Sequence, residues 1–238
     1  MYPLSQRVIR PAFDLISPFL ALPEVRAVWA FSSVNESGAL FDLSGQARTL
    51  TANGAPVRLI SASFVNYAQL DGAADYYSRA DEAGLSITGS ATYVGWFWTD
   101  TIAAGVAALV SKGTGTETTT SYQIVRSTAS LLASVGSGTA SNTLSSSMLL
   151  TASQWFYSAL VYSPSAELSI YHNLVKSSLT SCVIGSLTDN AAAFTLGAFS
   201  TPANYHSGRI TIGALCAKNL PDILIQSVFQ QTRSFFDV

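Results

Sequence analysis

Charged residues are scarce in this chain. It has 12 Lys and Arg and 14 Asp and Glu among 238 residues, which is 11% of the sequence, where soluble domains usually carry roughly 25%. The formal net charge is only -2. Because proteins bind nucleic acids largely through a strong positive field, a chain without that field lacks the main term for such binding. The composition therefore excludes nucleic acid as the expected partner.

Cysteines and long apolar runs are also scarce. The two cysteines, Cys182 and Cys216, have neither a CxxC spacing nor a neighbouring histidine, so we expect buried thiols rather than a zinc site or a redox pair. No apolar run approaches the roughly 20 residues of a membrane span. The apolar stretch at 15–22 is interrupted by Ser17 and Pro18, which makes it a poor signal peptide. We expect a protein made in the cytoplasm, with no signal peptide and no membrane partner.

Groups that support catalysis are few. The only histidines, His172 and His206, have no nucleophile or acid at a recognisable spacing, and neither a GxSxG elbow nor a phosphate-binding loop is present. Sandwich-fold glycosidases need two carboxylates roughly 5 to 10 Å apart, commonly at alternate positions of one strand. The nearest candidates lie around a turn instead, namely Asp71 with Asp75 and Asp81 with Glu82. We expect no enzyme and assign no catalytic residue.

Oxygen donors for a metal are limited to a few turn residues. Calcium prefers several carboxylate and carbonyl oxygens, and the candidate donors are Asp42, Asp100, Asp189 and Asn190. Asp and Asn also occur in turns because their side chains hydrogen-bond the local backbone. We therefore expect no cofactor, with calcium at Asp42 as the remaining metal candidate.

The first 25 residues are rich in both proline and large apolar side chains. Four of the eight prolines lie here, at Pro3, Pro11, Pro18 and Pro23, which argues against a long helix or a central strand. We predict an extended N-terminal arm over residues 1–25. Its apolar side chains must be covered, either by its own domain or by a neighbouring subunit or scaffold. The candidate assembly residues are Ile9, Phe13, Leu15, Ile16, Phe19 and Leu20.

From residue 26 the pattern changes to short apolar runs separated by turn residues. The strands predicted on this basis lie at 28–31, 57–60, 64–70, 91–99, 122–125, 131–135, 155–162, 168–171, 194–199 and 210–216. The polar stretches 111–120 and 134–147 predict hairpin loops or flat edge strands. One short helix is predicted at about 221–231, after Pro221. Residues 26–238 thus predict an all-β domain, a two-sheet antiparallel β-sandwich with a short C-terminal helix.

A series of short motifs resembles the laminin-G-like, concanavalin-A-like jelly-roll family. The motifs occur in the family's order across about residues 26–230: Val28 to Phe31, Asp42 to Gly45, Leu70 to Tyr77, Trp96 to Thr99, Val110 to Gly113, Thr151 to Tyr157, Leu168 to Asn173, Phe194 to Gly197, Ser207 to Ile210 and Asn219 to Phe229. The chain departs from the family at two places. Leu174 stands where the family has the glycine of an Asn-Gly turn, and Thr211 with Ile212 replaces acidic residues near the family's metal site.

The resemblance implies a binding or structural protein. The apolar arm and the stretch Asp42 to Leu50 are most similar to stand-alone members carried by tailed bacteriophages. On that analogy we expect a non-enzymatic structural or adhesive virion component, a head decoration or tail-associated protein. Its partners would be phage structural proteins and further copies of itself, with a trimer expected from phage appendages. The alternative is a lectin-like module for cell-surface glycans, with or without calcium, whose candidate ligand residues are Asp189, Asn190 and Tyr205.

Overall fold

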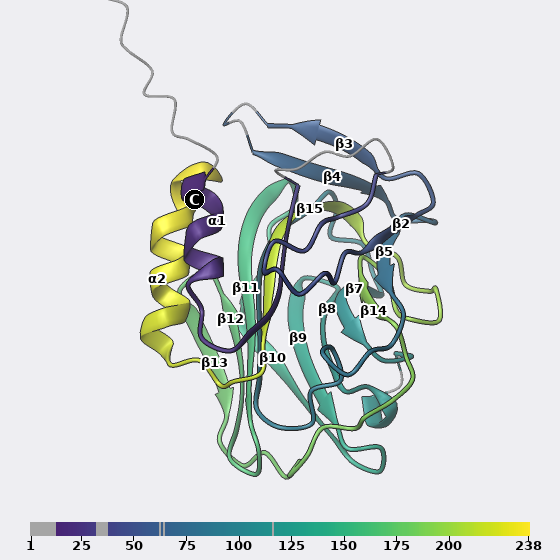
Figure 1. Ribbon diagram of the computed structural model, residues 1–238, viewed down its shortest axis with the longest axis vertical. Coiled ribbons are helices and arrows are strands. Elements are labelled where there is room, and N and C mark those ends of the chain that lie inside the picture. The colour runs from purple at the N-terminus through teal and green to yellow at the C-terminus, as the bar shows by residue number, and fades with distance from the viewer. Residues whose placement is uncertain (1–12, 32–37, 62, 64, 116) are drawn as a thin grey trace, which may run out of the picture.

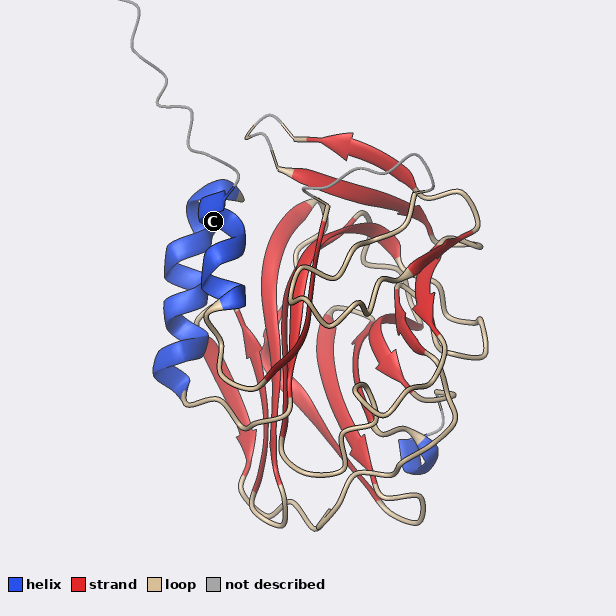
Figure 2. Cartoon of the chain, viewed as in Figure 1, coloured by secondary structure: helices blue, strands red, loops and turns tan. Residues whose placement is uncertain are grey.

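The structure is a computed structural model that describes residues 13–31, 38–61, 63, 65–115 and 117–238. Over these residues the chain forms two antiparallel sheets that face each other (Figure 2). The larger sheet runs β13 (Val175–Leu179), β12 (Glu167–His172), β11 (Gln154–Ser163), β6 (Ala91–Thr99), β15 (Ser207–Cys216), β4 (Asn66–Asp71) and β3 (Val57–Ile60), and β1 (Val25–Ala30) also pairs with β15. The smaller sheet runs β10 (Ser141–Leu149), β9 (Ser130–Gly136), β8 (Tyr122–Ser127), β7 (Val106–Lys112), β14 (Phe194–Leu196), β5 (Tyr76–Arg79) and β2 (Thr51–Asn53). The predicted two-sheet antiparallel sandwich is confirmed.

Alternation along the central strands explains why the larger sheet has two apolar faces. In β6, Phe97 points into the core between the sheets while Trp96 points to the outer face. The same holds in β11 for Phe156 and Tyr157. Each strand residue sends its side chain to the face opposite that of its neighbour, so a run such as Trp96-Phe97-Trp98 must be covered on both sides.

The outer face of the larger sheet is covered by two helices. Helices α1 (Phe13–Leu20) and α2 (Asp222–Thr232) lie side by side on that face, and β3 and β4 lie at the top of the molecule in this view (Figure 1). The short 3₁₀ helix η2 (Arg233–Phe235) follows α2, and η1 (Glu117–Thr119) belongs to a loop of the smaller sheet. None of the described helices is long and apolar enough to cross a lipid bilayer.

The extended arm predicted for residues 1–25 is wrong over Phe13–Leu20, which is helical. Proline inside a helix costs about 3 kcal/mol because a hydrogen bond is lost, and Pro18 lies inside α1. Burial of Ile16, Phe19 and Leu22 against the sheet and α2 offsets that cost. The spacing of Ile16, Phe19 and Leu20 was the available helical signal.

The described part of the N-terminal segment packs on its own domain. Ile16 is 8% exposed and Phe19 is fully buried, whereas Leu20 is 43% exposed and Leu15 lies between these extremes. Ile9 lies outside the described residues, and only the backbone of Phe13 is described. Of the two coverings left open by the sequence, packing on the domain itself accounts for Ile16 and Phe19.

Most other predicted elements match the structure. The helix expected at about 221–231 is α2, in which Ile225, Val228 and Phe229 are buried. The polar stretch 134–147 contains most of β10, an edge strand of the smaller sheet. The strand expected at 194–199 ends at Leu196, and β2, β5, β7 and β13 were not predicted.

Both cysteines are free and buried, as predicted. Cys182 belongs to the core between the sheets, while Cys216 belongs to the apolar layer under the helices. They are therefore on different sides of the larger sheet.

Candidate functional site

Asp42, the calcium candidate, has both carboxylate oxygens engaged by backbone amides. Oδ1 accepts hydrogen bonds from the amides of Val28 at 3.0 Å and Ser44 at 2.9 Å, and Oδ2 accepts one from the amide of Arg48 at 3.0 Å. These bonds fix the turn that follows β1. Within the described ranges, no group of three or more His, Cys, Asp or Glu side chains could hold a metal ion.

Asn190, a candidate ligand residue, holds a buried lysine. The ammonium of Lys112 is fully buried and donates to Asp81 Oδ1 at 2.8 Å, to the Asn190 carbonyl at 2.8 Å, to Asn190 Oδ1 at 3.2 Å and to the Ala192 carbonyl at 2.7 Å. Because an unpaired buried charge is costly, these oxygens serve a structural purpose. Asn190 thus ties its loop to the end of β7.

The other two candidate ligand residues have different surroundings. Asp189 is exposed. The half-buried ring of Tyr205 lies 6.0 Å from the ring of Tyr76, measured between centroids. Across the described part of the chain, no contact brings Asp189, Asn190 and Tyr205 into one site.

The carboxylate pairs singled out in the sequence are used by the fold. Asp71 Oδ1 accepts hydrogen bonds from three backbone amides of the turn after β4, and Asp75 accepts from the amides of Ala55 and Asp71. Glu82 pairs with the guanidinium groups of Arg48 and Arg79. These carboxylate oxygens are therefore engaged by backbone amides and arginines rather than directed at a ligand.

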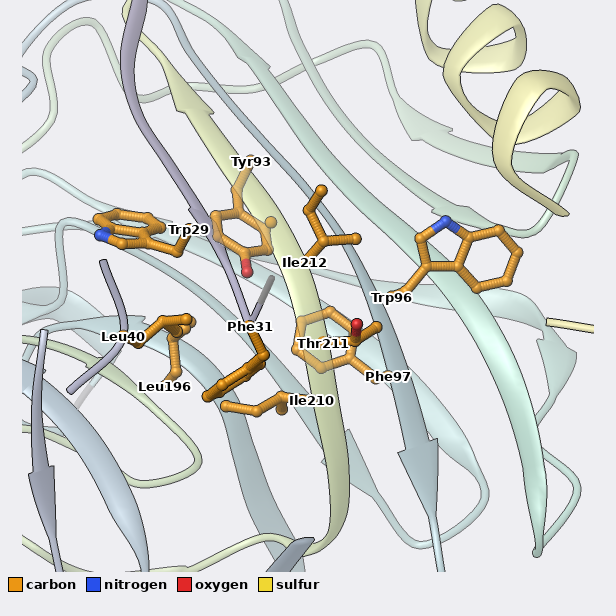
Figure 3. A pocket seen from close by; sticks show the side chains of 11 residues that line it. Trp29, Phe31, Leu40, Tyr93, Trp96, Phe97, Leu196, Ile210, Thr211 and Ile212 are labelled. Carbon is orange, nitrogen blue, oxygen red and sulfur yellow. The ribbon is translucent and has the colours of Figure 1, made fainter. Parts of the chain in front are cut away.

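A cavity in the core is too small for a ligand (Figure 3). Its volume is about 10 Å³, and it adjoins the β-bulge of β15 between Ile210 and Gly213. Trp29 and Phe31 line it, while Trp96 turns away toward the helices (Figure 3). Such a volume holds about one water molecule.

A larger, open pocket of about 190 Å³ lies where β12 and β13 meet the start of α2. Its charged groups pair with one another, since Lys176 Nζ lies 2.9 Å from Glu167 and 3.0 Å from Asp222. The Tyr171 hydroxyl donates to Asp222 at 2.6 Å. That bond, together with Lys176, holds the pKa of Asp222 below its usual range. The lining is therefore satisfied within the protein itself.

A row of side chains on the outer face of the larger sheet differs from these regions. The strand register places five residues opposite one another across β11, β6, β15, β4 and β3, and we call them the open row: Trp155, Trp98, Arg209, Gln69 and Val57. Exposure rises along the row from 8% at Trp155 to 54% at Val57. The row lies beyond the end of α2, where Phe236 packs on Trp155 with ring centroids 5.1 Å apart.

Arg209 stands at the centre of the open row and is fixed on three sides. Its guanidinium carbon lies 4.2 Å from the ring centroid of Trp98 and 4.8 Å from that of Tyr67. Its Nε donates to Gln69 Oε1 at 3.0 Å. In the part of the chain that the structure describes, Nη1 and Nη2 have no hydrogen-bond partner and no carboxylate within ion-pair distance. The open row thus presents an oriented cationic fork.

Asp100 anchors the residues around this fork. Its Oδ2 accepts from Gln69 Nε2 at 2.7 Å and from the Ser207 hydroxyl at 3.3 Å, and its Oδ1 accepts from Trp98 Nε1 at 3.0 Å. The carboxylate therefore orients two members of the open row, Trp98 and Gln69.

The backbone beneath the row is held by His206. Its Nε2 donates to the Trp98 carbonyl at 2.9 Å, and burial lowers the pKa of His206 to about 4. Gly208 allows this close approach, because a Cβ there would overlap the same carbonyl and the His206 ring. β15 can therefore lie against β6 at this point only with glycine at 208.

Sequence reasoning did not single out Arg209 as a site residue. It used Ser207 to Ile210 only as a fold motif. The available signal was alternation. Phe97 precedes Trp98 and Ile210 follows Arg209, and both neighbours face the core, so Trp98 and Arg209 must face outward. Which strands pair, and in which register, depends on long-range contacts that no local pattern reveals.

No family model and no curated protein matches the sequence. Solved structures with a similar fold include the binding domain of Paraclostridial Mosquitocidal Protein 1, with a TM-score of 0.70 at 12% identity over 87% of this chain and 52% of that one. The binding domain of Botulinum Neurotoxin DC is similar both in complex with SialylT (TM-score 0.65, 11% identity, 88% of this chain and 52% of that chain) and in complex with rat synaptotagmin II (TM-score 0.67, 11% identity, 88% and 52%). The chain spans about half the length of these structures, and the likeness shows a jelly-roll-like fold.

Proposed function

We propose that this chain is a non-catalytic carbohydrate-binding module that holds its ligand on the open row. The observation that carries the proposal is the environment of Arg209. Its guanidinium lies over the rings of Trp98 and Tyr67 and its Nε bonds to Gln69, while Nη1 and Nη2 have no partner among the described residues. Sites for sugars combine an apolar face with a few placed polar groups. Trp98 supplies the first, and Arg209 and Ser207 supply the second.

Two further observations support a binding rather than a catalytic role. The carboxylate pairs considered for glycosidic chemistry are held in turns and ion pairs. The solved structures named above are binding domains, and one of them is a complex with SialylT. Those proteins are about twice as long as this chain, so their ligands support only the class of function.

A glycan array tests the proposal, probed with the wild-type protein and with Arg209→Ala and Trp98→Ala, each with and without calcium. We expect glycan signals that fall at least tenfold in both variants and that do not depend on calcium. Tyr205→Ala serves as the matched control, because Tyr205 lies outside the open row. The absence of any signal at high protein concentration would contradict the proposal, as would a signal lost only in Tyr205→Ala.

A second candidate function is a structural or adhesive virion component of a tailed phage, and the exposed edge strand β3 favours it. Val57, Leu59 and Ile60 are 54%, 43% and 65% exposed. An exposed apolar edge strand is a surface on which further chains can pair. In this role the chain would be located in the virion, with partners among the shell or tail proteins and further copies of itself as a trimer. Attachment would use the N-terminal segment.

Light scattering on a sizing column tests the virion role, applied to the full chain and to a shortened chain that begins at Phe13. The shortened chain keeps α1, the helix that packs on α2 and the larger sheet. A trimer that becomes a folded monomer on removal of residues 1–12 would support attachment through that segment. The same number of subunits for the full and the shortened chain would contradict it.

A further inference from the structure

The geometry of the open row points to the chemical class of its ligand: we infer that Arg209 binds the carboxylate of a sugar that carries one acidic group. This inference rests on the proposed carbohydrate-binding function and deepens it. Arginine is suited to such a group because its planar fork donates two parallel hydrogen bonds to the two oxygens of a carboxylate.

Arg209 forms no salt bridge with any residue that the structure describes. The described ion pairs engage other cations, such as Arg48, Arg79 and Lys112 with their acids, and none includes Arg209. The hydrogen-bond partner of its Nε is Gln69, whose side chain is a neutral amide rather than an acid. A carboxylate placed against Nη1 and Nη2 therefore does not compete with an existing salt bridge.

The fork is held in place before a ligand arrives. Trp98 and Tyr67 lie against the guanidinium, and Gln69 is itself held by Asp100. An arginine side chain that is free in water loses rotamer entropy when it becomes fixed by a ligand. Here the rings and the amide have already restricted the side chain, so binding costs less.

The surroundings of the fork favour a sugar over a polyanion. Asp100 is linked to Arg209 through Gln69, and Asp71 stands opposite Ser207 in the strand register. The backbone amides of Ala74 and Ala73 hold the pKa of Asp71 below its usual range, so this exposed group is charged at neutral pH. These carboxylates repel a second acidic group, but they accept hydrogen bonds from sugar hydroxyls.

Calorimetric titration of the folded full chain tests this assignment. The probes are oligosaccharides that end in a uronic or a sialic acid, the same compounds with the carboxylate reduced to an alcohol, and an acidic peptide. We expect the acidic sugars to bind and the reduced sugars to bind at least tenfold more weakly, because a charge-assisted hydrogen bond is stronger than a neutral one.

Four variants complete the titration. Arg209→Ala should weaken acidic-sugar binding at least tenfold, and Arg209→Lys should restore only part of it, since an ammonium lacks the planar fork. Gln69→Ala should give a smaller loss through a less well oriented guanidinium. The matched control is Arg26→Ala, which removes an exposed arginine of β1 near the opposite end of β15 and should change nothing.

The outcomes separate this inference from the proposed function. Equal binding of acidic and reduced sugars, with loss in Trp98→Ala, would overturn the carboxylate assignment while carbohydrate binding on the open row stands. Arg209-dependent binding of the acidic peptide without any acidic sugar would overturn the sugar assignment. Failure of every sugar, acidic or neutral, would overturn the proposed function together with the inference.

Discussion

Two regions of the outer face of the larger sheet are built from the same strands but are completed differently. In the region under the helices, which we call the covered region, aromatic donors bond to α2: Tyr171 to Asp222, Tyr157 to the Ile225 carbonyl and Trp96 to Thr232. In the open row, the donors Nη1 and Nη2 of Arg209 have no such partner in the described chain. The chain satisfies the donors of the first region by itself, whereas two donors of the second have no partner among the described residues, and that is where we propose that the ligand binds.

The largest loss of stability is expected when Trp96 is removed from the covered region. Its ring stacks on Phe236 and Phe229, with centroids 4.1 and 5.6 Å apart. Trp96→Ala should lower the free energy of unfolding by about 3 to 5 kcal/mol, as large-to-small core changes do. Urea unfolding measures the loss. Trp98→Ala is the control and should lose less than half as much, because Trp98 is only partly buried; equal losses would contradict the distinction between the two regions.

Acid should lower the free energy of unfolding through His206, which lies beneath the open row. The folded protein keeps this histidine neutral down to about pH 4, whereas the unfolded chain binds a proton below about pH 6.5. Between these values the unfolded state holds more protons, so the free energy of unfolding falls as the pH falls, by at most roughly 3 kcal/mol.

Urea unfolding at pH 7 and pH 4.5 checks the acid effect in wild type and in His206→Gln. The variant should lose part of the difference between the two pH values, because burial also lowers the pKa of His172, which contributes in the same direction. An unchanged difference would assign the acid sensitivity to other groups.

A smaller effect is expected from the edge of the covered region. Tyr171→Phe removes the hydrogen bond to Asp222 and leaves the ring in place. The free energy of unfolding should fall by about 1 kcal/mol, and the pKa of Asp222 should rise, because the Tyr171 hydroxyl is the main cause of its low value. Thermal unfolding and a carboxyl titration by NMR measure the two effects. If the pKa of Asp222 in Tyr171→Phe equals that in the wild type, the hydrogen bond between Tyr171 and Asp222 would be refuted.

The smallest effect on stability is expected at the centre of the open row. Arg209→Ala removes a half-exposed side chain with one hydrogen bond to Gln69. The free energy of unfolding should change by less than about 1 kcal/mol, although ligand binding is lost. A large destabilisation in urea would mean that Arg209 is structural, which would remove the contrast between the two regions.

The architecture could be predicted from the sequence because strands and turns are local patterns. Alternation in residues such as Ile210 to Cys216 and aromatics on both faces of β6 and β11 indicated a sandwich with a covered outer face. The helix α1 is not predicted, because four prolines argue against a helix and the burial of Ile16 and Phe19 depends on α2, more than 200 residues away in the sequence.

The candidate site was harder to predict because it depends on register. Trp98, Arg209 and Gln69 come from three strands that are distant in sequence, and only their pairing brings them together. The candidates named instead, Asp42 and Asn190, were chosen for their oxygen donors, and the structure uses those oxygens for backbone amides and for Lys112. Residue type alone does not distinguish an oxygen that binds a ligand from one that holds a loop.

The four tryptophans allow the most direct test of the account, because they sample three environments. Trp29 lies in the core and Trp96 in the covered region, while Trp98 and Trp155 belong to the open row. In an NMR titration with an oligosaccharide that ends in a uronic or sialic acid, the indole N–H signals report on each. We expect the signals of Trp98 and Trp155 to shift and those of Trp29 and Trp96 to stay. Shifts confined to Trp29 or Trp96, or no shift at all, would contradict binding on the open row.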